Sequence, residues 1–267
     1  MLIEKFGNGV CFGLNALSFV AVIISLLLMR LPKFIPKEHT KNVLGELREG
    51  LVYIKNTPEI AFVVVMLGLI SLFVLPFSTL IPVYAKDIFH GTASTFGVID
   101  SVIGLGAFSG AIFLASLKSG VDRRKILAIN TFVFGIGLVL FSHETSYVLA
   151  LIFVAIGAFG MMSQVTLSNT IIQTTVAPEM RGRVISLYAM AFFGMQPLGG
   201  LIVGSISQRV GVENTVLAEG IIALLIGLWH VRFLQKNKLQ KEKPIEELIK
   251  EEQAEGVLHE FYRTTET

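Results

Sequence analysis

Seven long apolar stretches constrain the fold of this chain more than any other feature. A helix needs about 20 predominantly apolar residues to cross about 30 Å of hydrocarbon, because lipid offers no hydrogen-bond partner to a bare backbone. The sequence therefore predicts an all-α polytopic membrane protein with seven transmembrane helices. The predicted spans are 9–29, 60–85, 92–117, 126–142, 146–176, 184–207 and 214–234.

The composition excludes several other classes of protein. Only 16% of the residues are charged and 53% are apolar, whereas a soluble domain carries about 25% charged residues. The net charge of +2 gives no reason to expect a nucleic-acid partner. The single cysteine, Cys11, excludes an intramolecular disulfide and a multi-cysteine metal site. We therefore expect the lipid bilayer as the main partner, and neither a metal nor a cofactor.

The distribution of lysine and arginine predicts the orientation, since cationic loops resist translocation. With the first span running inward, all but three of the 22 Lys and Arg lie on the inner side, and the exceptions are Lys5, Lys86 and Arg209. This predicts an external N-terminus and a cytosolic C-terminus in a bacterial cytoplasmic membrane. An external start without an obvious signal peptide suggests that a segment once preceded Met1.

The spans and the segments between them divide the chain into four parts. Residues 1–29 form the first transmembrane helix, 30–59 a cytosolic linker, 60–234 a six-helix bundle and 235–267 a charged cytosolic tail. In the linker, apolar residues recur at spacings of three and four before Pro58 and predict an amphipathic helix. It is either an interfacial helix or a simple amphipathic connection. These apolar residues are Leu44, Leu47, Leu51 and Ile54.

Several segments resemble the major facilitator superfamily of transporters. The stretch APEMRGRVISLYAMAFFGMQPLGGLIVGSISQRVG is similar to the loop before that family's eleventh helix and to the helix itself. LPFSTLIPVYAKDIF and GVIDSVIGLGAFSGAIF are similar to the seventh and eighth helices, and FGLNALSFVAVIISLLLMRLP to the sixth, in the branch of bacterial drug and siderophore exporters. The resemblance covers roughly residues 6–234. It implies the sixth helix, the central linker and the C-terminal six-helix bundle of such a transporter, with the first five helices missing.

Two basic loop motifs are candidates for gating. In KSGVDRRK, the resemblance implies the counterpart of the family's loop motif, in which Asp122 would latch the cytosolic side together with Arg123 and Arg124. Positive-inside anchoring explains the same cations. The second motif comprises Arg181, Gly182 and Arg183, which follow Pro178, and gating and topology control are again alternatives.

The sixth span carries a candidate bend. Pro197 removes an intrahelical hydrogen bond, and nearby glycines permit both a kink and close helix contact. The pattern resembles, by internal pseudo-symmetry, the antiporter signature of the missing fifth helix. Small-residue packing is the alternative. The glycines in this motif are Gly194, Gly199 and Gly200.

Two carboxylates lie inside spans and are candidates for proton coupling, because charge in hydrocarbon is costly and a carboxylate there usually faces a cavity or a partner. Asp100 is on a helix that lines the cavity in the resembled fold, among apolar neighbours that disfavour its charged form. Glu219 is on a peripheral helix in that fold, where structural pairing or solvation is the alternative.

A polar stripe in the fifth span predicts contacts with a substrate. Four of its residues fall on one helical face toward the cytosol, and hydrogen bonding between helices is the alternative. The residues are Thr166, Asn169, Thr170 and Gln173, with Gln164 as a further candidate on the same span.

The absence of catalytic motifs selects among functions. The sequence has no GxxxxGKS/T phosphate loop, no paired histidine ligands and no GxSxG turn. We therefore predict a transporter rather than an enzyme, with gradient-driven export of a drug-like or siderophore-like molecule as an antiporter. The alternative is a truncated remnant or an assembly subunit that transports nothing. The missing N-terminal half or a second copy of the chain is the expected protein partner.

Overall fold

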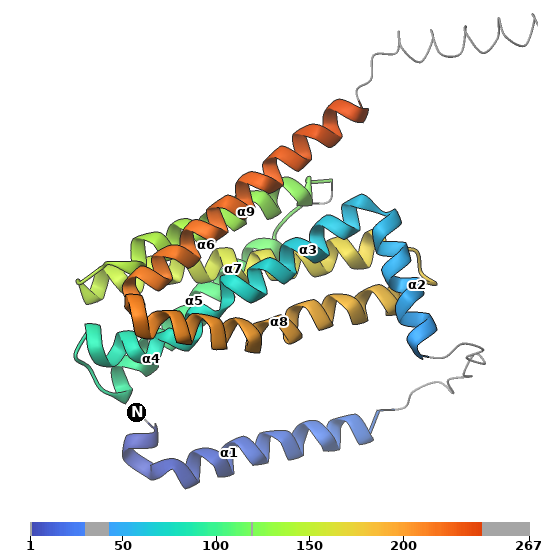
Figure 1. Cartoon of the computed structure of the whole chain (residues 1–267). Helices are drawn as coiled ribbons and strands as arrows, with labels where there is room; N and C mark the ends of the chain where they lie inside the picture. The colour runs from blue at the N-terminus through green and yellow to red at the C-terminus, as the bar shows by residue number, and fades with distance from the viewer. Residues whose placement is uncertain (1, 30–42, 119, 242–267) are drawn as a thin grey trace, which may run out of the picture. The chain divides into compact units, whose positions relative to one another are not determined.

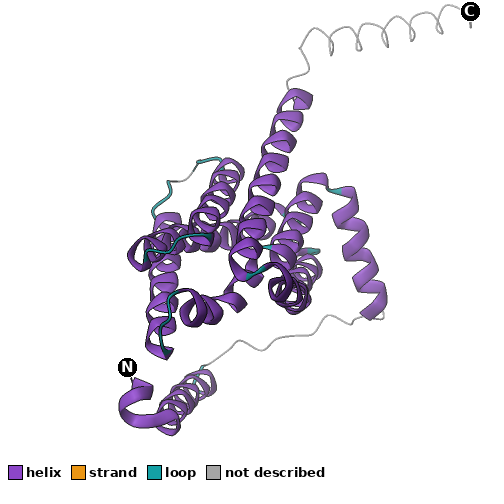
Figure 2. Cartoon of the chain, turned by 60° about the vertical axis from the view of Figure 1, so that its left-hand side comes forward, coloured by secondary structure: helices purple, strands orange, loops and turns teal. Residues whose placement is uncertain are grey.

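The computed structural model describes residues 2–29, 43–118 and 120–241. Every regular element within these ranges is a helix (Figure 2), as the sequence predicts. The predicted tail from residue 242 onward and the linker residues 30–42 lie outside the described residues.

The chain divides into two compact units, Met1–Glu49 and Gly50–Thr267. The first unit contains α1 (Leu2–Leu27), which overlaps the first predicted span, 9–29, but begins and ends before it. Its described apolar part, Asn15–Leu27, is shorter than the spans of the second unit. The large apolar side chains described in α1 are exposed within this unit, as expected of a helix that lipid or another helix covers.

The second unit contains six helical segments that are long and apolar enough to cross a membrane (Figure 1). They confirm the other six predicted spans to within a few residues at each end. The segments are Pro58–Ile88, α5 (Ala93–Ala115), α6 (Arg123–Ser142), α7 (Tyr147–Thr175), α8 (Arg181–Val210) and α9, which runs from Val212 to Lys241 with its span ending at Lys236. The chain is therefore a multi-pass membrane protein.

The first of these segments is not a uniform α-helix. α3 (Pro58–Phe73) has Val74 as its C-cap, and a 3-10 turn, η1 (Leu75–Leu80), follows. α4 (Ile81–Val83) and a π-helical turn, η2 (Tyr84–Ile88), complete the segment. Pro76 and Pro82 each lack the amide hydrogen that a continuous helix requires, which accounts for the change of geometry.

Close contacts between small residues hold the bundle together. α6 packs against both α7 and α9, α5 packs against α7, and α3 packs against α8. A Cβ atom on Gly110 would approach the backbone oxygen of Phe159 within 2.7 Å, and one on Gly160 would approach that of Asn130 within 2.6 Å. Glycine therefore sets the spacing of α7 from α5 and from α6.

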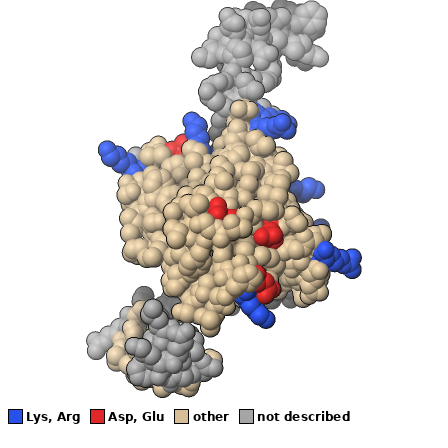
Figure 3. Space-filling view, turned by 90° about the vertical axis from the view of Figure 1, so that its left-hand side faces the viewer, with Lys and Arg blue, Asp and Glu red and all other residues tan. Residues whose placement is uncertain are grey.

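The two ends of the six-helix unit differ in charge. Figure 3 views the end where α9 begins, and several acidic side chains lie on that face, whereas most of the Lys and Arg lie at its outline. Acidic residues at this end include Asp87 in η2, Glu144 before α7 and Glu213 in the first turn of α9. The opposite end carries Lys118 and the Arg123 to Lys125 run.

Candidate functional site

A cavity of about 280 Å³ lies beside the broken segment and is the best candidate for a substrate site. Five elements contribute to it: η1, α4, α5, α7 and α8. Its lining is mostly aromatic and aliphatic, and Asp100, Gln196 and Ser78 are its polar members. The apolar lining residues are Leu75, Phe77, Ile81, Phe96, Ile103, Met161, Met162, Val165 and Phe192.

Asp100 lies on α5 with its side chain exposed, and it belongs to this cavity. Its neighbour Ile99 is buried and anchors the helix, so the next position points away from that core. The cavity therefore offers one carboxylate and one amide among apolar side chains. Such a site is suited to an amphipathic molecule, because its apolar surface binds hydrocarbon groups and a few polar groups fix the orientation.

The break in the first segment positions the cavity wall. Ser78 Oγ donates to the Leu75 carbonyl at 3.0 Å, and Thr79 Oγ1 donates to the Pro76 carbonyl at 2.7 Å. Each bond joins a hydroxyl to the carbonyl three residues earlier in the turn. The turn places Phe77 and Ser78 at the cavity wall.

Glu219 occupies a different place. It lies on α9 and is 2% exposed, and neither of its carboxylate oxygens has a hydrogen-bond partner among the described residues. It is not part of the cavity that contains Asp100. The two carboxylates predicted as alternatives are therefore in separate surroundings.

The polar stripe of α7 separates into three parts. Thr166 and Thr170 line a second cavity, of about 290 Å³, together with Lys118 and Arg123. The Gln173 amide donates to Asn169 Oδ1 at 2.7 Å, so these two residues pair with each other along the helix. Gln164, in contrast, is fully buried, and its amide atoms have no partner among the described residues. The structure thus brings Thr166 and Thr170 to a basic loop residue and places Gln164 elsewhere.

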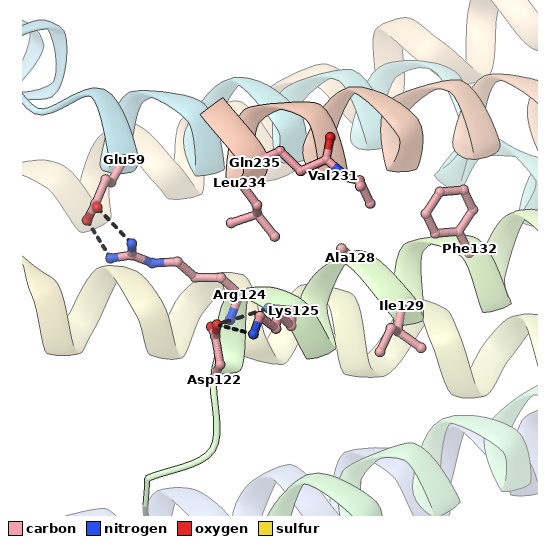
Figure 4. A pocket seen from close by; sticks show the side chains of 10 residues that line it. All are labelled: Glu59, Asp122, Arg124, Lys125, Ala128, Ile129, Phe132, Val231, Leu234 and Gln235. Atoms are coloured by element: carbon pink, nitrogen blue, oxygen red, sulfur yellow. Dashed lines mark hydrogen bonds and ion pairs between the residues drawn. The ribbon is translucent and has the colours of Figure 1, made fainter. Parts of the chain in front are cut away.

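The first basic motif forms the start of α6. The Asp122 carboxylate accepts hydrogen bonds from the backbone amides of Arg124 and Lys125, which makes it the N-cap of the helix. Arg124 reaches across to α3, where both guanidinium ends bind the Glu59 carboxylate (Figure 4). Arg123 instead faces the cavity that contains Thr166. The three motif residues therefore have three different surroundings.

The second motif lies where α2 (Val43–Asn56) meets the bundle. α8 begins at Arg181, and a Cβ atom on Gly50 of α2 would lie 3.3 Å from Arg183 Cβ. The Ala177 amide donates to the Tyr53 hydroxyl at 3.2 Å. Gly182 has nothing within 4 Å of its Cβ position. The buried face of α2 thus includes Gly50 and Ile54, whereas Leu47 and Leu51 are exposed.

The glycines of α8 are not equivalent. α8 continues through Pro197 as a single helix of 30 residues. A Cβ atom on Gly199 would collide with the Leu72 carbonyl oxygen and lie 2.6 Å from Pro76 Cγ, so Gly199 packs directly on the break after α3. For Gly194 and Gly200, the nearest atoms lie 4.0 Å and 3.7 Å from the position that a Cβ atom would take.

Sequence reasoning missed several residues of the first cavity and of the ion pair. Gln196 stands directly before Pro197, and Met161 and Met162 directly before the polar stripe. The signal that could have found Gln196 is its polarity in an apolar span. Glu59 follows Pro58 in the first turn of a helix. A carboxylate there is commonly explained by its favourable interaction with the helix dipole, so its sequence position does not indicate an ion pair.

Within the described residues, no group of three or more His, Cys, Asp or Glu is placed to hold a metal ion.

Comparison with known proteins places the chain among membrane transporters. Residues 1–259 match the family described as transmembrane secretion effector. Macrolide efflux protein A of Streptococcus pyogenes is 21% identical over 220 residues, which cover 80% of this chain and 54% of that protein. Multidrug efflux pump Tap of Mycolicibacterium fortuitum is 25% identical over 190 residues, 71% of this chain and 46% of the pump. The Staphyloferrin A transporter of Staphylococcus aureus is 25% identical over 167 residues, 62% of this chain and 42% of the transporter. The chain spans about half the length of these relatives.

Proposed function

Because the chain belongs to the transmembrane secretion effector family, we propose that it forms the cavity wall of a major facilitator exporter for an amphipathic small molecule. The relatives are named for macrolide efflux, multidrug efflux and staphyloferrin A transport. The single observation that carries the proposal is the cavity of about 280 Å³ that holds Asp100 and Gln196 among aromatic and methionine side chains. The relatives are transporters, which fits a function other than catalysis.

The proposed mechanism uses Asp100 as a reversible proton carrier. Asp100 belongs to the cavity, so its protonation and binding of the substrate would compete there. The movement of protons down their gradient would then drive export of the substrate in the opposite direction. The broken segment and the contact of Gly199 with it would let the wall change shape as the cavity opens to one side or the other.

The proposed orientation places the N-terminus outside and the basic end of the bundle in the cytosol of a bacterial inner membrane. The positive-inside rule supports it, since Lys118, Arg123, Arg124 and Lys125 lie at one end of the bundle, whereas Lys86 and Arg209 lie at the other.

Export of dyes and antibiotics from pump-deficient bacteria tests the proposal. The chain is expressed with and without a polypeptide that supplies the rest of a relative's length, because the resemblance implies a cavity between two halves. We expect efflux from the completed transporter and its loss in Asp100→Asn. If both the chain alone and the completed transporter insert into the membrane but show no efflux, the result would favour a subunit or remnant that transports nothing.

A further inference from the structure

A groove between α6 and α9 is separate from the proposed transport cavity and has a volume of about 600 Å³. Figure 4 shows its two walls, with α6 contributing Ala128, Ile129 and Phe132 and α9 contributing Val231 and Leu234. All five belong to segments that are long and apolar enough to cross a membrane. The apolar walls of the groove therefore belong to helices that are able to cross a bilayer.

The groove has a charged end. Glu59, Asp122, Arg124 and Lys125 line it where α6 begins. From Lys125 to Phe132 the helix rises about 10 Å, so Phe132 lies about two turns along α6 from the charged end of the groove.

The carboxylates at this end are already engaged. Glu59 binds both guanidinium ends of Arg124, and Asp122 Oδ1 caps the first turn of α6. The Lys125 ammonium lies 3.7 Å from Asp122 Oδ2, which is too long for a good hydrogen bond, and its side chain is 72% exposed. Lys125 therefore has donors available for another anion.

The surroundings of the groove add positive charge. Arg232 and Lys236 lie in the last turns of the α9 span, beside the groove residues Val231 and Gln235 in sequence. The groove thus combines apolar walls with an end where both carboxylates are engaged and Lys125 keeps exposed donors.

We propose that this groove binds an anionic phospholipid, with its phosphate at Lys125 and one acyl chain against Phe132 between α6 and α9. Basic pockets between transmembrane helices select such headgroups, because the cations attract the phosphate while the apolar walls exclude water. The site does not depend on the transport cavity, since Asp100 and its neighbours take no part in it.

Tryptophan quenching by brominated lipids tests the proposal on the full chain in phosphatidylcholine vesicles. The reporter combines Trp229→Phe, which removes the single native tryptophan, with Phe132→Trp in the groove. Brominated phosphatidylglycerol should bind at this reporter about five-fold more tightly than brominated phosphatidylcholine. Equal quenching by the two lipids, or quenching by neither because a protein segment fills the groove, would overturn the proposal.

Three controls separate this site from general lipid contact. Lys125→Gln should abolish the preference, whereas Lys86→Gln, at the opposite end of the bundle, should keep it. In the unsubstituted chain, Trp229 packs on Phe62 outside the groove and should show no preference. Three outcomes would overturn the proposal. The preference for phosphatidylglycerol could survive Lys125→Gln, or it could appear equally at Trp229. It could also disappear in millimolar inorganic phosphate at constant ionic strength. Circular dichroism verifies folding, and Ile129→Trp on the same wall is a second reporter.

Discussion

Arg124 binds Glu59 through both guanidinium ends, although 65 positions separate the two residues. The Nη1 to Oε1 distance is 2.7 Å, and the pair ties the first turn of α6 to the first turn of α3. The side chains of Arg124 and Glu59 keep 34% and 27% of their surface exposed, so solvent screens the interaction. Two-point geometry makes it stronger than an ordinary surface pair.

We expect this pair to show a coupling energy of about 1 kcal/mol in a double-mutant cycle. Glu59→Gln and Arg124→Gln should each lower the thermal midpoint of the detergent-solubilised chain, and the double variant should lose less than the sum. Trp229 fluorescence reports unfolding, since it packs on Phe62 one turn from Glu59. Strictly additive losses would show that the pair contributes nothing to stability.

Gly199→Ala should destabilise the bundle by about 1–3 kcal/mol, because the new methyl group would meet the Leu72 carbonyl and Pro76 rather than a flexible side chain. Gly204→Ala is the matched control on the same helix, where nothing lies within 4 Å of the Cβ position. That variant should be neutral or slightly stabilising, because alanine favours helix. Thermal unfolding in detergent compares them, and equal midpoints would contradict the close contact.

Glu219→Gln should leave the thermal midpoint unchanged or raise it. Glu219 is buried without a hydrogen-bond partner among the described residues, and a charge in that position would cost more than a neutral amide. Glu213→Gln, in the first turn of the same helix, is the control. A large loss of stability in Glu219→Gln alone would show that a carboxylate partner exists.

Hydrophobic length made the spans predictable from sequence, since a bilayer imposes one minimum length on every crossing helix. The break at Leu75–Leu80 was not predicted, although Pro76 and Pro82 stand there, because membrane helices often tolerate proline. Asp100 could be recognised from the cost of charge in hydrocarbon. Gln196 could have been recognised from its polarity in an apolar span. Glu59 could not, because its role depends on Arg124, which lies 65 positions away in the sequence.

Topology can be measured directly with single cysteines in a Cys11→Ser background. A membrane-impermeant maleimide added outside intact cells should label Thr145→Cys, between α6 and α7. It should label Val121→Cys and Glu179→Cys only after the cells are permeabilised. These positions lie in loops at the two ends of the bundle. Labelling in the reverse pattern would contradict the orientation that the lysine and arginine distribution predicts.

The most direct test of the account measures drug-driven proton movement in vesicles that contain the chain together with a polypeptide that supplies the rest of a relative's length. The unsubstituted protein should move protons when substrate is added, and Asp100→Asn should insert normally but abolish that movement, because its amide cannot carry a proton through the cavity. Asp87→Asn, an exposed acidic residue in η2 outside the cavity, should retain it. Unchanged coupled flux in Asp100→Asn would contradict the central claim and leave Glu219 or a residue of the other half as the coupling site.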